Sequence, residues 1–102
     1  MKPDLPSGLW SGYYQQHGRR FDQQATLEFA DGLIRGDGVD GIGLFRIEGE
    51  YRLENGQVRL GWIKTYEGAH SILYLGQLVE QTILGEYNVQ GMRGGFAFEP
   101  VR

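Results

Sequence analysis

LGWIKTYEGAHSILYLGQL, residues 60–78, is the stretch that decides the fold of this protein. It consists of two runs rich in aromatic and β-branched residues, separated by a short turn around Gly68. Residues of these types pack well on the pleated surface of a sheet, so the stretch predicts a β-hairpin. Bulky residues occupy both odd and even positions of each run. We therefore expect the hairpin to be covered on both of its faces.

Similar short runs fill the rest of the chain. Asp31-Gly32 and Asn55-Gly56 favour two-residue hairpin turns, because glycine adopts the positive φ angles that such turns require. Residues 44–53 alternate apolar and charged side chains, as a strand with one solvated face does. The expected strands are residues 9–16, 21–30, 33–36, 44–53, 57–66, 70–80, 82–89 and 95–101, with 1–7 as a lead-in and 36–43 forming a glycine-rich loop.

Eight short strands joined by tight turns are typical of an antiparallel meander. An open meander would leave two unpaired edges, and closure into a barrel removes them. We therefore predict an all-β fold, an eight-stranded antiparallel up-and-down β-barrel, built from residues 1–102 as a single domain. A barrel of eight strands has room for its own side chains or for one small ligand.

The composition narrows the classes of function. The formal net charge is −3 and no basic stripe is present, which argues against nucleic-acid binding. The chain has no cysteine, which excludes thiol catalysis and zinc–thiolate sites. No apolar run is long enough to span a membrane, and the first ten residues do not resemble a signal peptide. We expect a soluble cytoplasmic protein, unless a leader has been removed.

Short motifs resemble the central strands of the avidin and streptavidin family. They are Leu60-Gly61-Trp62, Ala69-His70-Ser71 and Gly76-Gln77, in the order of that family. The opening Gly8-Leu9-Trp10 is similar to the first-strand G-x-W of lipocalins. The resemblance implies a streptavidin-like, calycin-type barrel and, by analogy with the packing of avidin, a tetramer.

The resemblance does not extend to the residues that bind biotin. Tyr66 and Leu75 stand where the family has tryptophan walls, and Leu73 stands where it has a threonine. Only Ser71 matches a polar contact of that site. Each lost hydrogen-bond partner costs about 1–3 kcal/mol. The resemblance therefore implies a branch of the family without tight biotin binding.

One expected function is non-catalytic binding of a small apolar or aromatic ligand at the open end of the barrel. Tyrosine and tryptophan suit such a site because they combine an apolar ring with a polar tip. The predicted ligand-binding residues are Tyr14, Trp62, Lys64, Tyr66, Ser71 and Tyr87. Trp10 is instead expected in the core, where it plugs the closed end.

Lys64 allows two interpretations. It shares the parity of Trp62 and Tyr66, and on an inward face it would favour an anionic ligand or have a lowered pKa. The interpretation that we favour places Lys64 near the strand end, where its ammonium reaches solvent and its stem packs on the rings.

The alternative function is a filled barrel that serves as a homo-oligomeric interaction module. Only one face of residues 70–80 can line the barrel, and the other must be covered, because large exposed apolar patches mark contact sites. We assign Ile72, Tyr74 and Leu78 to an oligomer interface, in a homodimer or homotetramer. Interior volume separates the two functions. In a filled barrel, large side chains meet across the axis, with Leu73, Leu75, Tyr87, Phe96 and Phe98 as the candidates.

Catalysis is not indicated. His70 and Ser71 are adjacent on one strand, so they face opposite sides and cannot pair as base and nucleophile. Asp37 and Asp40 lie among glycines but lack the acidic ladder of a calcium loop, and we expect both to be solvated. The sequence therefore predicts no catalytic residues, no cofactor and no metal site.

Overall fold

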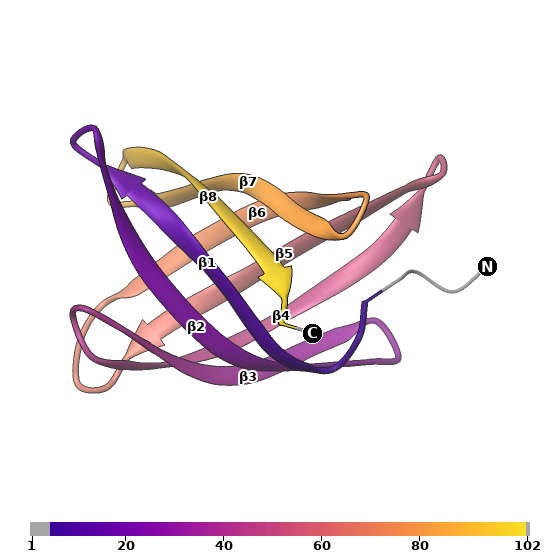
Figure 1. Ribbon diagram of the computed structural model, residues 1–102, viewed down its shortest axis with the longest axis horizontal. Coiled ribbons are helices and arrows are strands. Elements are labelled where there is room, and N and C mark those ends of the chain that lie inside the picture. The colour runs from indigo at the N-terminus through magenta and orange to yellow at the C-terminus, as the bar shows by residue number, and fades with distance from the viewer. Residues whose placement is uncertain (1–4, 102) are drawn as a thin grey trace.

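The computed structural model describes residues 5–101 and confirms the predicted barrel. Eight antiparallel strands follow one another in chain order, and β1 pairs with β8 to close the sheet (Figure 1). The strands are β1 (Gly8–Gln16), β2 (Arg19–Ala30), β3 (Leu33–Asp40), β4 (Leu44–Glu54), β5 (Gln57–Tyr66), β6 (Ser71–Val79), β7 (Thr82–Val89) and β8 (Met92–Pro100).

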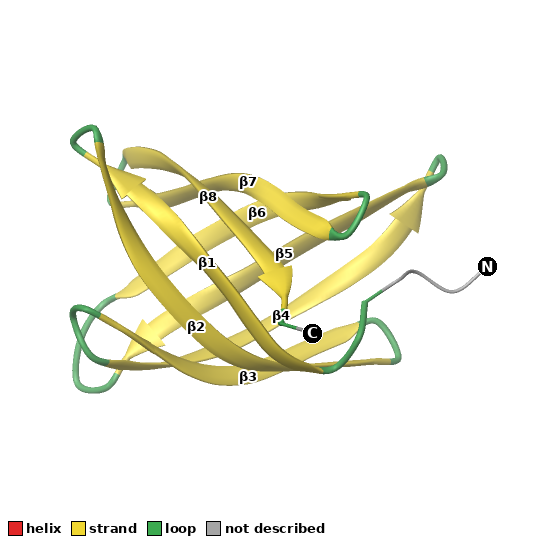
Figure 2. Ribbon diagram, viewed as in Figure 1, coloured by secondary structure: helices red, strands yellow, loops and turns green. Residues whose placement is uncertain are grey.

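Strands and loops account for all of residues 5–101, and no helix occurs among them (Figure 2). A search of this part of the chain accordingly finds no apolar helix with the length needed to cross a membrane. Residues 1–4 of the expected lead-in lie outside the described residues.

Tight turns join the strands where the sequence predicts them. Asp31 and Gly32 have φ angles of 53° and 80°, and Asn55 and Gly56 have 53° and 77°. Two successive positive φ angles are characteristic of the type I′ turn, whose twist matches that of the flanking strands. The turns lie at two ends of the barrel. The Trp10 end carries the turns at 31–32, 55–56 and 80–81, and the Asp40 end those at 17–18, 41–43, 67–70 and 90–91.

Aromatic side chains fill the middle of the barrel. The indole of Trp62 stacks on the ring of Tyr74, with centroids 5.5 Å apart and planes at 11°. Trp62 also meets Phe96 edge-on at 5.3 Å, and Phe96 meets Tyr74 at 4.8 Å. These residues come from β5, β6 and β8, so the rings pack together across the interior.

Glycines on the inward face make room for other side chains of the core. A Cβ atom on Gly38 would lie 2.6 Å from the ring of Phe45, and one on Gly36 would lie 2.8 Å from the side chain of Leu27. Both glycines belong to β3, which continues to Asp40 instead of ending at residue 36 as predicted. The prediction ended the strand at Gly36 and placed Gly38 in a loop, whereas close packing inside the barrel requires both glycines. The longer strand carries Asp40 to the edge of the barrel interior.

The N-terminal segment covers the Trp10 end. Trp10 is fully buried, as predicted, and its indole N–H donates a hydrogen bond to the carbonyl oxygen of Pro6 at 2.8 Å. Leu5 packs against the core, and the hydroxyl of Ser7 accepts a hydrogen bond from the backbone N–H of Phe29. These contacts fasten the segment across this opening.

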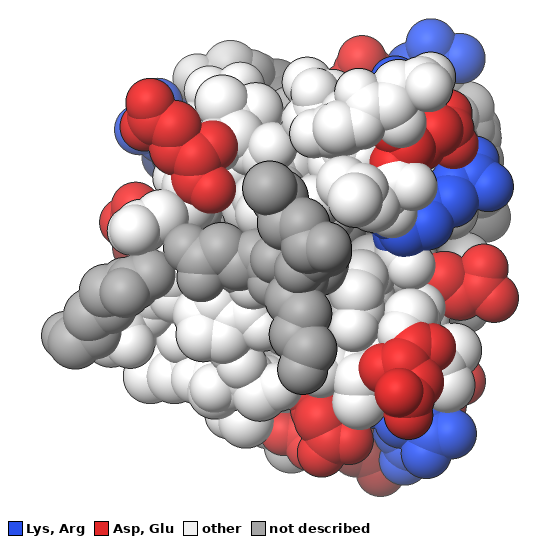
Figure 3. Space-filling view, turned by 90° about the vertical axis from the view of Figure 1, so that its right-hand side faces the viewer, with Lys and Arg blue, Asp and Glu red and all other residues white. Residues whose placement is uncertain are grey.

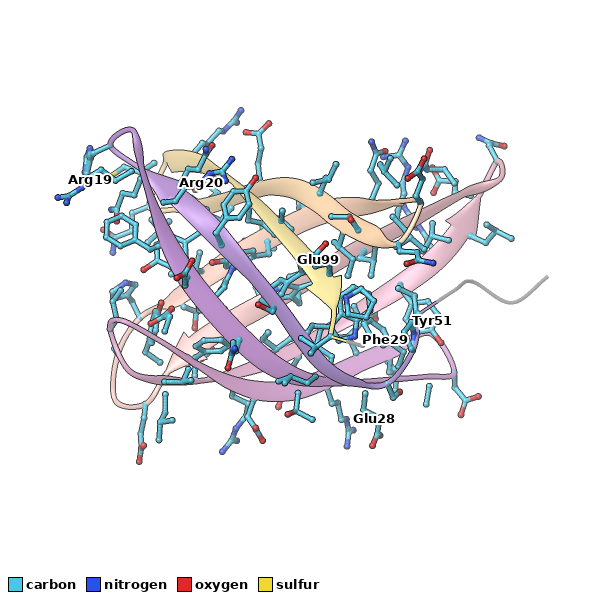
Figure 4. The ribbon with its side chains drawn as sticks, in the orientation of Figure 1. Arg19, Arg20, Glu28, Phe29, Tyr51 and Glu99 are labelled. Atoms are coloured by element: carbon cyan, nitrogen blue, oxygen red, sulfur yellow. The ribbon has the colours of Figure 1, made fainter. Side chains whose placement is uncertain are left out.

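The Trp10 end is also packed from within. Phe29 on β2 and Tyr51 on β4 lie together at this end, with ring centroids 5.9 Å apart, while Glu28 points away from the barrel (Figure 4). Viewed from this end, acidic and basic residues lie around the margin of the molecule (Figure 3). Charged side chains therefore lie around the rim of the Trp10 end, whose interior is filled by apolar side chains.

Candidate functional site

A buried polar cluster lies inside the barrel at the Asp40 end. Lys64 is only 1% exposed, and its ammonium donates to the Oδ2 atom of Asp40 at 2.7 Å and to the amide oxygen of Gln23 at 2.9 Å. The hydroxyl of Tyr66 donates to the same Oδ2 atom at 2.5 Å. The Lys64 ammonium also lies 3.4 Å from the hydroxyl of Tyr74. We call these five residues the Lys64 cluster.

Four strands position the cluster. Gln23 on β2 is the direct partner of Asp40 on β3, and direct partners in an antiparallel pair share a face. Lys64 and Tyr66 are two residues apart on β5, so both point inward. Tyr74 comes from β6. The side chains meet because the barrel closes, although they are distant in the sequence.

The Asp40 carboxylate has hydrogen-bond donors on both of its oxygens. Oδ2 accepts from Lys64 and Tyr66, and Oδ1 accepts from the backbone N–H groups of Ile42 at 2.9 Å and Gly43 at 3.3 Å. The side chain is fully buried. Two expectations are therefore wrong: Asp40 is not solvated, and the Lys64 ammonium does not reach solvent.

Burial and pairing set the charge states of the cluster. Burial lowers the pKa of Lys64, and the hydrogen bond and charge of Asp40 offset only part of this effect. For Asp40, burial alone would raise the pKa, but the hydrogen bonds from Lys64 and Tyr66 outweigh it and hold the pKa below its ordinary value. Burial and the neighbouring Asp40 raise the pKa of Tyr66. At neutral pH the cluster therefore contains a carboxylate and a protonated tyrosine.

Aromatic rings form the walls around the Lys64 ammonium. It lies 4.2 Å from the ring centroid of Phe45 and 4.9 Å from that of Tyr14. A cation over the face of an aromatic ring is attracted by the ring quadrupole, and more strongly where water is excluded. Tyr14 in turn stacks on Phe21, with centroids 5.3 Å apart. The cluster is thus an ionic group inside an aromatic enclosure.

Two buried donors have no partner within the described residues. They are the Nε2 atom of Gln23 and the Nε1 atom of Trp62. Leaving a buried N–H without an acceptor costs about 1–3 kcal/mol, so most such groups in folded proteins are paired. The unpaired Gln23 donor is notable because the oxygen of the same amide accepts from Lys64.

The structure brings five of the six predicted ligand-binding residues into the barrel. Ser71 is the exception: it is exposed on the outer face, where its hydroxyl lies 3.0 Å from that of Thr65. The five buried residues are Tyr14, Trp62, Lys64, Tyr66 and Tyr87.

The two faces of β6 are the reverse of those predicted. Ile72 and Tyr74 are buried in the barrel and Leu78 packs against the core from the same face, so none of them forms an outer interface. The register explains the reversal: Tyr74 is the direct partner of Trp62, and the two must share the inward face. The alternate residues Leu73 and Leu75 point outward, and of the predicted axial side chains only Tyr87, Phe96 and Phe98 are interior.

Gln23 and Asp40 are the site residues that the sequence prediction missed. Gln23 has the parity of Ala25 and Leu27, which are both inward, so the alternation of β2 could have identified it. Asp40 has the parity of Ile34, but Gly36 and Gly38 interrupt the apolar pattern between them. Glycine leaves no mark of inward or outward orientation in a sequence.

Outside the barrel, two grooves lie on either side of a ridge. The larger, of about 850 Å³, runs over β3, β4 and β5, and the smaller, of about 430 Å³, lies over β6 and β7. Leu73 and Leu75 line both grooves and form the ridge between them. We define the outer apolar face as Ile63, Leu73, Leu75 and Leu84, each about 39–57% exposed.

The sequence matches no protein-family model and no curated protein. The Lys64 cluster and the outer apolar face are the two features of the molecule from which we infer its function.

Proposed function

We propose that this protein is a non-catalytic association module, which forms a homodimer through its outer apolar face. The observation that carries the proposal is the exposed leucine ridge on β6, where Leu75 is 57% and Leu73 40% exposed. Ile63 is the direct partner of Leu73 on the neighbouring strand, so the apolar surface continues onto β5. Contiguous exposed apolar surface of this kind usually marks a contact site.

A second copy of the chain fits this surface in shape. In a two-fold dimer the same patch faces itself, so it must be self-complementary. A ridge beside a groove meets this requirement, because the ridge of each copy can enter the groove of the other. Gly61 lines the larger groove beside Leu75, and the flexible end of the Leu75 side chain lies over it.

The charges of the larger groove are also self-complementary. Its β4 side carries Glu48 and Glu50, and arginines 35, 52 and 59 lie along the same groove. A wall with both signs can face its own copy with opposite charges opposed, whereas a groove of one sign would repel it. A second copy is therefore the occupant that the surface favours.

Binding of a small ligand inside the barrel is our second candidate, because the interior is packed. The interior rings meet at 4.8–5.5 Å around Trp62, Tyr74 and Phe96, so a ligand would have to displace side chains. An up-and-down barrel of eight antiparallel strands supports a streptavidin-like relationship, which we propose at the level of the fold, without a biotin site. A cytoplasmic location remains a prediction.

Sedimentation velocity over a range of concentrations tests the proposal. The wild-type protein is expected to sediment as a dimer. Leu75→Glu places a charge on the ridge and is expected to give a monomer with an unchanged thermal melt, because the side chain is largely exposed. Leu9→Glu is the matched control: Leu9 is 43% exposed on β1, three strands around the barrel from β6, which carries Leu75.

A wild-type monomer at every concentration would overturn the proposal. Equal dissociation of the Leu75→Glu and Leu9→Glu variants would also contradict it, because the contact would then not lie on the outer apolar face.

A further inference from the structure

The residues around Asp40 provide hydrogen-bond donors for both oxygens of a carboxylate. Lys64 and Tyr66 contact one oxygen at 2.7 and 2.5 Å, and two backbone N–H groups of the 41–43 turn contact the other at 2.9 and 3.3 Å. Charge-assisted hydrogen bonds of this kind are the strong ones. The donors of Lys64 and Tyr66 belong to the wall of the barrel, so they would remain in place without Asp40.

Apart from the ladder pairing of Asp40 with Gln23 and the hydrogen bond from the Asp40 backbone N–H to the Gly43 carbonyl at 3.1 Å, the segment that carries this carboxylate has few contacts. Asp40 is the last residue of β3, and the turn that follows is Gly41-Ile42-Gly43. Ile42 is 67% exposed, and a Cβ on either glycine would meet no atom within 4 Å. Segments with few apolar contacts open at a low free energy, well below that of global unfolding. The carboxylate can therefore leave the interior while the barrel stays folded.

Gln23 supplies a donor that Asp40 does not use. Its amide oxygen accepts from Lys64, which places the amide inside the cluster, and its Nε2 atom is buried without a partner in the described residues. The residue is 1% exposed, so solvent does not hydrate this N–H. An unused buried donor beside a cation and a hydroxyl is a further hydrogen-bonding group that an acceptor in this site can use.

From these contacts we infer that the Asp40 end of the barrel is a binding site for a small organic carboxylate, which displaces the Asp40 side chain from Lys64 and Tyr66. The ligand carboxylate takes the donors of these two residues and offers an acceptor to Gln23. Its apolar part lies against the rings of Tyr14 and Phe45. The Asp40 side chain beyond its Cα has the atoms of acetate, so acetate is the smallest member of the ligand class. The site is independent of the outer apolar face.

Competition by Asp40 determines the expected affinities. A tethered group acts at an effective concentration in the millimolar range or above, and the apparent affinity of a ligand falls with the fraction of open sites. We therefore expect weak binding of acetate to the wild-type protein. Asp40→Ala removes the competitor, so acetate is expected to bind this variant at least about tenfold more tightly.

The experiment titrates sodium acetate into the full-length protein, with sodium chloride at equal ionic strength as the reference. Binding is followed by the melting temperature and by amide NMR shifts. Asp37→Ala is the matched control, because Asp37 lies on the same strand but is exposed on the outer face. Asp40→Ala is expected to bind acetate much more tightly than the wild-type protein. Asp37→Ala is expected to bind it with the wild-type affinity. The double variant Asp40→Ala/Lys64→Met is expected not to bind acetate.

Asp40→Ala leaves Lys64 buried without its partner, so the experiment also covers a variant that does not fold by itself. In that case recovery of the folded state with acetate, and not with chloride, is the supporting result. The wild-type protein gives a second readout, since the amides of Ile42 and Gly43 lose their Asp40 acceptor when acetate binds. Equal affinities of the wild-type and Asp40→Ala proteins, no acetate response of Asp40→Ala, or wild-type Ile42 and Gly43 amides that do not shift would each overturn the inference.

Discussion

Gly49 and Trp62 are direct partners on β4 and β5, and a Cβ atom on Gly49 would lie 2.6 Å from the Cβ of Trp62. Real Cβ atoms do not approach so closely, and the nearest atoms belong to the backbone and the root of a buried side chain, which cannot move aside. One of the two tryptophans of the core thus lies directly beside a residue that has no side chain.

Gly49→Ala is therefore expected to destabilise the protein by about 1–3 kcal/mol, the usual cost of overpacking a core. Urea unfolding followed by tryptophan fluorescence measures the change. The control is Gly61→Ala on the adjacent strand. A Cβ there would lie 3.1 Å from the flexible end of Leu75 on the outer face, and we expect a change within about 0.5 kcal/mol. Equal effects of the two substitutions would contradict this account of the interior glycines.

Trp62→Ala is expected to cost about 3–5 kcal/mol, because it removes a large buried side chain from the centre of the core. Trp62 is 2% exposed and contacts Tyr74 and Phe96. Leu44→Ala, at a residue that is 65% exposed, is expected to be nearly silent in the same melt. Tyr74→Glu, at a residue that is 1% exposed, should prevent folding altogether. A folded Tyr74→Glu protein that merely dissociates would restore the original assignment of the β6 faces.

The ion pair of Lys64 and Asp40 predicts strong coupling between the two residues. Lys64→Met leaves a buried carboxylate without its cation and is expected to cost about 3–5 kcal/mol. Adding Asp40→Asn removes the unpaired charge, so the double variant should recover much of this loss. A double-mutant cycle in urea measures the coupling energy.

An exposed ion pair serves as the comparison for this cycle. Arg52 and Glu54 are 3.0 Å apart, but their side chains are 74% and 42% exposed. Solvent screens such a pair, and Arg52→Ala is expected to cost less than about 1 kcal/mol. For the buried pair, the contrary result is additivity. If the free-energy changes of Lys64→Met and Asp40→Asn added up to that of the double variant, the two residues would not be coupled in stability.

Buried tyrosines predict a loss of stability at high pH. Burial raises the pKa values of Tyr66 and Tyr74 above the ordinary 10.0, and the charge of Asp40 raises them further. The unfolded chain therefore releases these protons first, so the folded state binds more protons above pH 10 and stability falls as the pH rises. Lys64, with its lowered pKa, acts in the opposite direction, but only up to its ordinary value of 10.5.

Urea midpoints measured from neutral pH to above pH 10.5 test this prediction. Tyrosinate absorbance should appear together with unfolding, because the buried hydroxyls ionise only when the barrel opens. Tyr66→Phe is expected to reduce the slope of stability against pH. Tyrosinate formation by all six tyrosines in a folded barrel near pH 10 would be the contrary result.

At low pH, Asp40 makes the opposite contribution. Its pKa lies below the ordinary 3.8, because its hydrogen bonds to Lys64 and Tyr66 outweigh the effect of burial. The stabilisation is fully present above pH 3.8 and is lost as the pH falls through the lower, folded-state value. Asp40→Asn is expected to remove this part of the acid transition, and an unchanged acid transition in the variant would count against it.

Much of the barrel could be predicted from local patterns. The β5 and β7 boundaries, 57–66 and 82–89, agree with the prediction residue for residue. The turns at Asp31-Gly32 and Asn55-Gly56 followed from the need for two positive φ angles. Alternation and turn chemistry are properties of neighbouring residues, so a sequence displays them directly.

Neighbouring residues in the sequence do not determine which face of β6 points into the barrel. Residues 72–79 are bulky at both parities, and only the pairing of Thr65 with Ser71 decides which parity is inward. A slip of one residue in that register would exchange the two faces. The inward position of Tyr74 and the outward position of Leu75 are thus results of pairing with β5.

By itself, the sequence determined the strands, their tight turns and the all-β architecture, since each depends on residues close together in the chain. The tertiary structure alone decided that β3 continues through Gly36 and Gly38, and that Asp40 meets Lys64 inside the barrel. These two residues are 24 positions apart and lie on strands that are not neighbours in the sheet. Only closure of the barrel brings them within hydrogen-bond distance, because closure turns the inward faces of separate strands toward one interior.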